Sequence, residues 1–368
     1  MKLGIRILSK EIIKAKNSPI KFYFMRNTFF LLFALLLLCS HDLYLKMETY
    51  FLQPNQEATL SLYNGTFEKS ENLITRDRML DASVIAQGKR IAMNPKQWKD
   101  QDSTISQLTF TTGEAGTYVA GVSTKPRNIE LIAEKFNSYL EHDGILDVLE
   151  QRTEENSLDQ DAIESYEKHV KAIYQVGDIK TDDWNAVLGY PIEFVPKANP
   201  YKKYSGEKLQ VQLLLDGDPL ADQLVYADHI ASAHAHTNGK HSHDNLQDGK
   251  EHSHTDGEHD HSHESQAEEA HTHTSGQQLR TNDQGIVSVN LPEDGIYYLR
   301  TINMIKVNDS DELTHRSKWA TLTFEVSHKH DTSTHSHDDD DESIPTWVFV
   351  LGSLIIIGLL FFVFRKRN

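Results

Sequence analysis

Histidine carries the clearest chemical pattern in this sequence. The chain has 368 residues, with 20 histidines and one cysteine, Cys39. Many of the histidines alternate with other residues as His-x-His. In an extended chain, residues i and i+2 point the same way about 6.5–7 Å apart, and neutral imidazole is a good ligand for nickel, cobalt, zinc and copper. The spacing predicts binding of a divalent transition-metal ion.

The predicted ligands form two tracts. The first histidine tract contains His229, His234, His236, His241, His243, His252, His254, His259, His261, His263, His271 and His273. The second histidine tract contains His328, His330, His335 and His337, and runs into the acidic sequence DDDDE. The first tract is rich in acidic residues and has only Ile230 and Leu246 as large apolar residues, so we predict a disordered loop. The alternative is a polar spacer that binds no ligand.

A different kind of metal site is predicted at His41. If a signal sequence is removed after Ser40, the new α-amine and the imidazole of His41 can chelate one ion together, an arrangement usually associated with copper. Asp42 would add a carboxylate to this site. The alternative interpretation is that His41 is simply the first residue of a strand.

Catalytic signatures are absent from the sequence. It contains no H-E-x-x-H zinc motif, no G-x-S-x-G nucleophile motif and no glycine-rich phosphate loop. The formal net charge of −17 argues against nucleic-acid binding, which needs a basic surface. We therefore predict a binding protein without enzymatic activity.

The N-terminal 40 residues are predicted to be a signal peptide. Residues 29–38 form a ten-residue apolar run after Lys21 and Arg26, which matches a secretory signal and is too short to span a bilayer. Met25 opens a compact signal and is an alternative start. Cleavage after Ser40 is favoured over lipidation of Cys39, because Leu38 is bulky where a lipoprotein signal needs a small residue.

The C-terminal end is predicted to anchor the chain in a membrane. Residues 347–364 are uncharged and apolar, about 27 Å long as a helix. Basic residues at 365–367 follow, so the tail 365–368 should be cytoplasmic and the body periplasmic or extracellular. We predict a transmembrane helix over 345–364, preceded by a His/Asp-rich stalk over 327–344, in a single-pass protein of a bacterial envelope.

The body is predicted to be mainly β, as two Ig-like or prealbumin-like β-sandwich domains. Alternating apolar residues predict strands at 43–52, 58–63, 108–112 and 118–123. The N-terminal domain, 41–190, should carry a helical insert over about 126–176. Its first helix begins near Pro126 and ends at Asp143-Gly144, and its second begins at Ser157 and ends at Gly177.

The C-terminal domain is predicted over 191–326. Strands are expected at 209–215, 223–226, 286–291, 296–302 and 319–326. The first histidine tract interrupts this sandwich as a surface loop over 229–277, where a long insertion costs little closure entropy.

Four segments resemble one known family: HDLYLK (residues 41–46), GTYVAGVSTKPRNIEL (116–131), VLGYPIEFVPKANPY (187–201) and ELTHRSKWATLTFE (312–325). They resemble the NikM-like periplasmic family associated with nickel and cobalt uptake, a domain of unknown function. The resemblance covers most of residues 41–326. It implies a secreted Ig-like sandwich, sometimes with a C-terminal membrane helix and histidine-rich inserts, and nickel or cobalt as the metal. A chain with one anchor departs from a multi-pass transporter subunit and is not itself a channel.

The sequence thus predicts a membrane-anchored, extracytoplasmic protein that binds a transition metal, nickel or cobalt by resemblance and zinc or copper by chemistry. It would serve metal uptake or homeostasis, with a metal transporter or an outer-membrane receptor as partner and no nucleic acid. The alternative is a non-catalytic envelope module that binds a protein and uses the histidine tract as a spacer.

Overall fold

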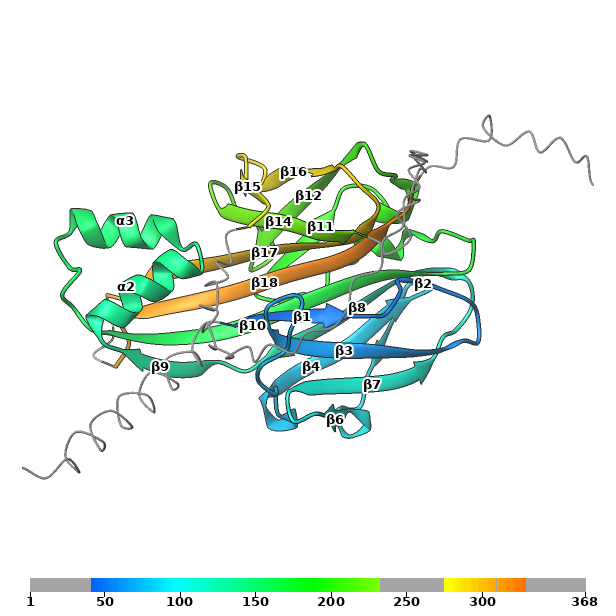
Figure 1. Cartoon of the computed structure of the whole chain (residues 1–368), viewed down its shortest axis with the longest axis horizontal. Coiled ribbons are helices and arrows are strands. Elements are labelled where there is room, and N and C mark those ends of the chain that lie inside the picture. Colours follow the sequence, from blue (N-terminus) through cyan, green and yellow to red (C-terminus); the bar gives the residue numbers. More distant parts are fainter. Residues whose placement is uncertain (1–40, 232–274, 309, 311, 329–368) are drawn as a thin grey trace, which may run out of the picture. The chain divides into compact units, whose positions relative to one another are not determined.

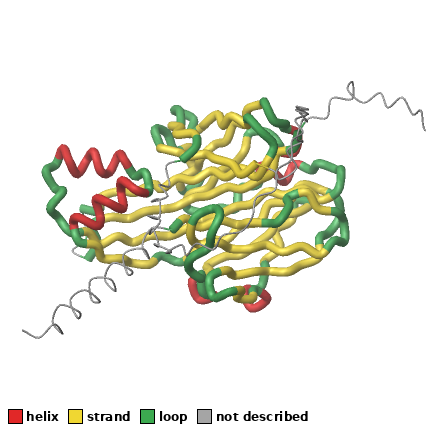
Figure 2. Tube along the Cα trace, viewed as in Figure 1, coloured by secondary structure: helices red, strands yellow, loops and turns green. Residues whose placement is uncertain are grey.

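A computed structural model describes residues 41–231, 275–308, 310 and 312–328 of the chain. Strands dominate this part, and the two α-helices lie together at one end of the largest sheet (Figure 2). The predicted β-sandwich class is therefore confirmed in its coarse form.

The largest sheet has ten strands, and its long members run through the middle of the fold (Figure 1). Its order is β15 (Gln277–Arg280), β14 (Leu224–Ala231), β17 (Gly295–Lys306), β18 (His315–Val326), β10 (Ala162–Val176), β8 (Gly116–Thr124), β4 (Met79–Ala86) and β5 (Lys89–Ala92). The short strands β2 (Phe51–Leu52) and β9 (Arg127–Leu131) both pair with β10. We call this sheet the main sheet.

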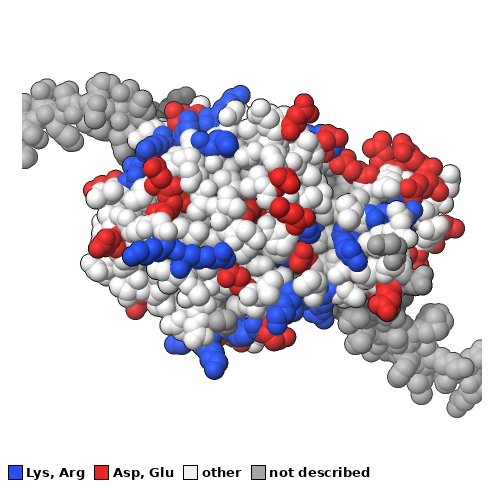
Figure 3. Space-filling view, turned by 180° about the vertical axis from the view of Figure 1, so that it is seen from behind, with Lys and Arg blue, Asp and Glu red and all other residues white. Residues whose placement is uncertain are grey.

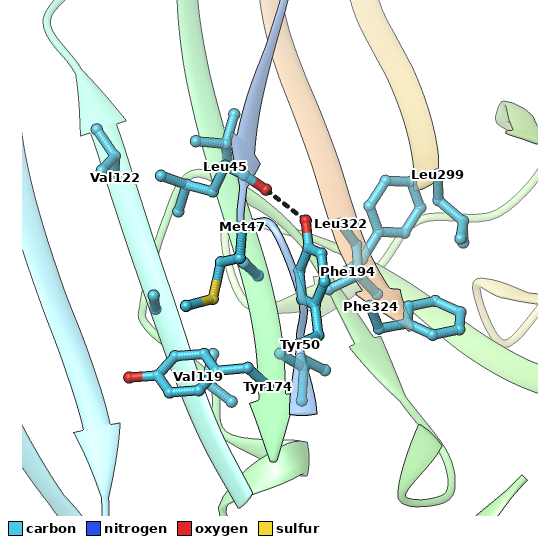
Figure 4. Packing of buried hydrophobic residues seen from close by; sticks show 14 of the residues in the cluster. Leu45, Met47, Tyr50, Val119, Val122, Tyr174, Phe194, Leu299, Leu322 and Phe324 are labelled. Atoms are coloured by element: carbon cyan, nitrogen blue, oxygen red, sulfur yellow. Dashed lines mark hydrogen bonds between the residues drawn. The ribbon is translucent and has the colours of Figure 1, made fainter. Parts of the chain in front are cut away.

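Two four-stranded sheets pack with the main sheet. The first has the order β1 (Asp42–Lys46), β3 (Glu57–Gly65), β7 (Ile105–Thr111) and β6 (Lys99–Gln101). The second contains β11 (Ile192–Pro196), β12 (Glu207–Leu215), β13 (Asp218–Pro219) and β16 (Ile286–Leu291). One hydrophobic cluster includes residues of all three sheets. Figure 4 shows part of it, with Leu45 of β1, Phe194 of β11 and Leu322 of β18.

The described residues belong to one compact unit that ends at His328. The predicted domain boundary near residue 190 falls inside this unit, because β10 from the N-terminal half pairs in parallel with β18 from the C-terminal half. Their register runs from Glu164 opposite His315 to Ala172 opposite Thr323. The two halves therefore share one sheet and one core.

The predicted strands of both halves are present, with ends that differ by a few residues. The predictions at 58–63, 108–112 and 118–123 correspond to β3, β7 and β8. The expected strand at 43–52 is divided into β1 and β2. In the C-terminal half, the five predictions correspond to β12, β14, β16, β17 and β18.

The predicted second helix is wrong. The segment from Ala162 to Val176 is the longest strand, β10, and not a helix. Its apolar residues Ile163, Tyr166, Val170 and Ile173 fall at helical spacing by coincidence. From Lys168 onward every residue of β10 is buried, because the strand is central and covered on both faces, and this removes the alternation that identifies a strand.

The helical insert is shorter than predicted. The segment after Pro126 forms β9, and helix α2 runs over Ala133–His142. The predicted end at Asp143-Gly144 is confirmed, with Gly144 at φ +70°. A second helix, α3 (Leu146–Glu154), was not predicted. Phe136, Tyr139 and Leu140 of α2 form a separate small core with Trp319 and other residues of the main sheet.

Several predictions lie outside the described residues: the signal peptide over 1–40, most of the first histidine tract, the stalk after residue 328 and the membrane span over 345–364. Within the described ranges, no helix has the length and apolar character needed to cross a membrane. On the face shown in Figure 3, Lys and Arg side chains are interspersed with Asp and Glu.

Candidate functional site

The start of β1 is fastened to the main sheet by side chains. β1 is an edge strand of its own sheet, so the carbonyl groups on its outer side need other donors. Thr321 Oγ1 donates to the Leu43 carbonyl and Thr323 Oγ1 to the Leu45 carbonyl, both at 2.6 Å. Lys168 Nζ donates to the His41 carbonyl. The carbonyl groups of three alternate residues, 41, 43 and 45, therefore accept hydrogen bonds from side chains of β10 and β18.

His41 lies at the beginning of this strand and is 7% exposed. Its Nε2 atom is 3.3 Å from Glu71 Oε2, on the loop that follows β3. A carboxylate at this distance from one ring nitrogen fixes the orientation of the imidazole. Metal-bound histidines commonly have such a carboxylate on the ring nitrogen that does not bind the metal. Metal binding by His41 stays a prediction.

Asp42 is in a buried ion pair. Its Oδ2 atom lies 2.9 Å from Arg300 Nε and accepts a hydrogen bond from the Tyr44 hydroxyl at 3.0 Å. The same guanidinium donates to the Asp143 carbonyl at the end of α2, at 2.7 and 3.1 Å. These contacts give Asp42 a structural role that joins β1, β17 and the helical insert, and its role as a metal ligand stays a prediction.

A cavity of about 30 Å³ lies beside His41, between β3, β9, β10, β18 and α2. Asn64, Tyr139, Glu164, Lys168 and Trp319 line it. It is large enough for about two water molecules and too small for an organic ligand. Sequence reasoning did not find this group of polar side chains.

Glu164 is the carboxyl group among the residues that line this cavity. Ser317 and Tyr139 donate hydrogen bonds to its Oε1 atom, the latter at 3.2 Å, and Trp319 Nε1 donates to Ser317 Oγ at 2.9 Å. Burial raises the pKa of Glu164 to about 7, against the lowering effect of these hydrogen bonds. The group therefore changes protonation near neutral pH.

Lys168 shares the cavity with Glu164. Its Nζ atom donates to Asn64 Oδ1 at 3.1 Å and lies 4.6 Å from the centre of the Trp319 ring. Burial lowers the pKa of Lys168 to about 8, although Asp42, Asp143 and Glu164 oppose this effect. In the described part of the chain, no ion pair joins Lys168 to a carboxylate.

Lys171, three residues later, is buried on the opposite face of β10 and has conventional partners. Its Nζ atom lies 3.0 Å from Glu193 Oε2 and donates to the carbonyls of Ala186 and Phe194 at 2.9 Å. Glu193 also accepts from three successive backbone N–H groups, of Leu188, Gly189 and Tyr190. This pair holds the loop before β11 against the sheet.

Two predicted metal ligands of the histidine tracts are described. His229, predicted to lie in the loop, belongs to β14, where its ring stacks on Tyr297 at 4.9 Å and Nε2 lies 3.9 Å from Glu293. His328 follows β18, and its Nδ1 lies 3.0 Å from Ser205 Oγ. The other tract histidines lie outside the described residues. Across the described ranges, no three His, Cys, Asp or Glu side chains are arranged to hold a metal ion.

One signal could have revealed the cavity residues. Glu164, Tyr166 and Lys168 occupy alternate positions, so in a strand they share one face. The helical interpretation used Ile163, Tyr166, Val170 and Ile173 as an apolar face and gave Glu164 and Lys168 no role. A strand interpretation would have shown a polar stripe on a buried element, which is unusual enough to suggest a site.

No curated protein matches this chain. Among solved structures, a DUF4785 family protein from Legionella pneumophila is 7% identical, with a TM-score of 0.18, and 50% of this chain aligns with 37% of that chain. The chain thus spans little more than a third of that structure.

Two further matches are a part of intimin and an adhesin of Yersinia pseudotuberculosis. The D0-D1 domain of intimin is 8% identical, covers 77% of this chain and 97% of its own, and has a TM-score of 0.16. The adhesin InvE of Yersinia pseudotuberculosis is 11% identical, covers 77% and 58%, and has a TM-score of 0.18. TM-scores this low carry no argument about fold or function.

A family model matches residues 38–305, which include most of the main sheet, the cavity residues Asn64 to Lys168 and the first histidine tract. The match covers well over half of the 368 residues. It attaches neither a nickel nor a cobalt function to the chain. The chain belongs to the family described as a domain of unknown function, DUF4198.

Proposed function

We propose that this chain is a membrane-anchored, extracytoplasmic protein that binds divalent transition-metal ions through its two histidine tracts and serves metal uptake or homeostasis. The observation that carries the proposal is the common origin of the tracts. Both leave the folded body from the same end of the main sheet, although they are far apart in the sequence.

The strand register defines this common origin. Ala231, the last described residue before the first tract, is opposite Gly295, and Gly295 is opposite Val326 near the end of β18. Neighbouring strands lie about 4.8 Å apart, so the two exit points are separated by about 10 Å. Imidazoles from both tracts would be concentrated in one region, which favours metal capture by many weak sites.

The fold also tolerates the first tract without depending on it. β14 and β15, the strands on either side of the tract, pair directly with each other from Leu224 opposite Arg280 to Ala227 opposite Gln277. The tract therefore joins two neighbouring antiparallel strands, and no described core residue comes from it. An insertion at such a site adds binding capacity at little cost in closure entropy.

The resemblance of the sequence favours nickel or cobalt as the ion, and imidazole chemistry also accommodates zinc and copper. A single membrane anchor would keep the tracts next to the membrane on its outer side. From there, bound ions would pass to a metal transporter or an outer-membrane receptor. The ion is cargo in this proposal and not a resident cofactor.

The test is metal titration of the purified protein with Ni²⁺, Co²⁺, Zn²⁺ and Cu²⁺. Deleting residues 232–274 and replacing the histidines of the second tract by Asn should remove most bound ions per chain while leaving the unfolding temperature nearly unchanged. Lowering the pH from about 7.5 to 5.5 should release metal, because free imidazoles protonate near 6.5.

The control replaces residues 232–274 by a segment of equal length in which every His is Asn and every acidic residue is kept. It should lose metal as the deletion does, since carboxylates alone bind these ions weakly. If the deletion leaves the stoichiometry unchanged, the tract is a spacer, and the alternative of a protein-binding envelope module gains support.

A further inference from the structure

The amine of Lys168 and the side-chain amide of Asn64 face each other inside the cavity beside His41. Lys168 Nζ is 3.1 Å from Asn64 Oδ1, and the amide carbon Cγ is bonded to that oxygen at about 1.2 Å. The two reacting groups of an amide exchange are therefore already neighbours, and a small rotation of the lysine side chain brings Nζ into attack distance of Cγ.

The backbone on both sides holds this pair in place. Asn64 N donates to Ser70 Oγ, and the Asn64 carbonyl accepts from Glu71 N, both at 3.0 Å. Lys168 N donates to Thr124 Oγ1 at 2.9 Å. Two side chains 104 positions apart in the sequence are thus kept together by rigid strands of different sheets.

As an ammonium, Lys168 would be an unusual group for the interior of a protein. Buried lysines are normally paired with carboxylates, because an uncompensated buried charge is strongly unfavourable. Lys168 is 5% exposed, and its hydrogen-bond acceptors are a backbone carbonyl and an amide oxygen. Burial of Lys168 disfavours the charged form of its side chain, so the neutral amine, which is the nucleophilic form, becomes accessible.

We propose that Lys168 and Asn64 form an intramolecular isopeptide bond that covalently joins β10 of the main sheet to β3 of the first small sheet. The neutral Nζ attacks Cγ of the Asn64 side chain, so that an Nζ–Cγ bond forms. The Cγ–Nδ2 bond then breaks, and Nδ2 leaves as ammonia with one proton taken from Nζ. No oxidant, reductant or cofactor is needed.

Glu164 carries the proton in this step. It is the carboxyl group that lines the same cavity as the amine and the amide, and its raised pKa lets it exist in both protonation states near neutral pH. In the neutral form it donates a proton toward the leaving Nδ2, and as the carboxylate it accepts one from Nζ. The cavity has room for a water molecule that relays the proton.

The bond would stabilise the fold by a covalent link between sheets, as a disulfide does. The described ranges contain no cysteine, so no disulfide joins the sheets there. A link between residues 64 and 168 closes a large loop and fastens the strand next to β1 to the centre of the main sheet.

The test is mass spectrometry of the full-length protein after denaturation and trypsin digestion. The expected product is peptide 47–69 joined to peptide 153–171, lighter than their sum by one ammonia, about 17 Da. Trypsin should not cut after Lys168 but should cut after Lys171, which serves as an internal control. Recovery of the separate peptides 47–69 and 153–168 in full yield would overturn the proposal.

Variants then separate the roles of the residues. Lys168→Ala and Asn64→Ala should both abolish the joined peptide, whereas Asn64→Asp should restore it with loss of water in place of ammonia. Glu164→Gln should reduce the joined fraction by tenfold or more in freshly folded protein. A fully joined Glu164→Gln protein would overturn the role of Glu164. The wild-type mass decides the bond itself even where a variant fails to fold.

Discussion

Two buried lysines on one strand have opposite environments. Lys171 faces Glu193 at 3.0 Å, and that carboxylate is also held by three backbone N–H groups. Lys168, on the other face of β10, has an amide and a carbonyl as acceptors and a carboxyl group of raised pKa in its cavity. The first arrangement neutralises a buried charge by pairing. The second places the amine beside the amide of Asn64, with which we propose that it reacts.

The largest effect is expected for Lys168→Met. If the isopeptide bond forms, this variant loses a link across 104 positions, and its unfolding free energy should fall by roughly 5 kcal/mol, by analogy with a disulfide closing a loop of that size. Urea unfolding measures the change. Asn64→Ala should cause a similar loss, and combining both variants should add little. A neutral or stabilising Lys168→Met would contradict the link, because replacing an unpaired buried ammonium by an apolar group is favourable.

Glu193→Ala should lower the unfolding free energy by about 3–5 kcal/mol, since it leaves Lys171 charged and uncompensated. The matched control is the double variant Lys171→Met, Glu193→Leu, which removes both charges and should recover most of this loss. Chemical denaturation of the three proteins gives the comparison. Equal losses in the single and double variants would show that the backbone contacts of Glu193, and not the ion pair, stabilise the loop.

Glu164 should make stability depend on pH. Its folded pKa of about 7 lies above the ordinary value of 4.5, so the folded state binds the proton more tightly. The contribution of Glu164 is therefore largest below pH 4.5, falls as the pH rises toward 7, and is then constant. The stability difference between wild type and Glu164→Gln should change by on the order of 3 kcal/mol over this window. A constant difference between pH 4.5 and 7.5 would show that Glu164 has an ordinary pKa.

The smallest effect is expected at Lys318, a half-buried lysine whose partner is exposed. Lys318 Nζ lies 2.8 Å from Asp216, whose side chain is 67% exposed. Solvent screens such a pair, so Lys318→Met should change the unfolding free energy by less than about 1 kcal/mol. Thermal melts at low and high salt check this. If Lys318→Met lowered the unfolding free energy as much as Glu193→Ala does, burial would not explain the difference between the ion pairs of Lys318 and Lys171.

The sequence predicted much of the fold where strands alternate clearly. β12, β16 and β18 fall close to their expected positions because turn residues and alternating apolar residues mark them. β10 was misread as a helix, since a strand covered on both faces has no alternation over its buried half. α3 was missed because its weakly apolar face packs on a small core that only the folded insert creates.

Of the candidate sites, too, one kind could be predicted from the sequence and the other could not. The histidine tracts are visible in the sequence because their ligands are close neighbours along the chain. The cavity was not visible, because Asn64, Glu164 and Trp319 come from segments far apart in the sequence. His229 shows the limit of the local pattern: it belongs to the tract by spacing, yet it packs on Tyr297 within the main sheet.

The sequence by itself determined the β class of the body, the composition of the tracts and the residues available to bind a metal, because these follow from local alternation and residue type. Only the tertiary structure decided that both tracts leave from one end of one sheet, since this depends on the register of β14, β17 and β18. It also decided that Lys168 meets Asn64 and not a carboxylate. Contacts between distant strands depend on how the sheets pack, and no local pattern encodes them.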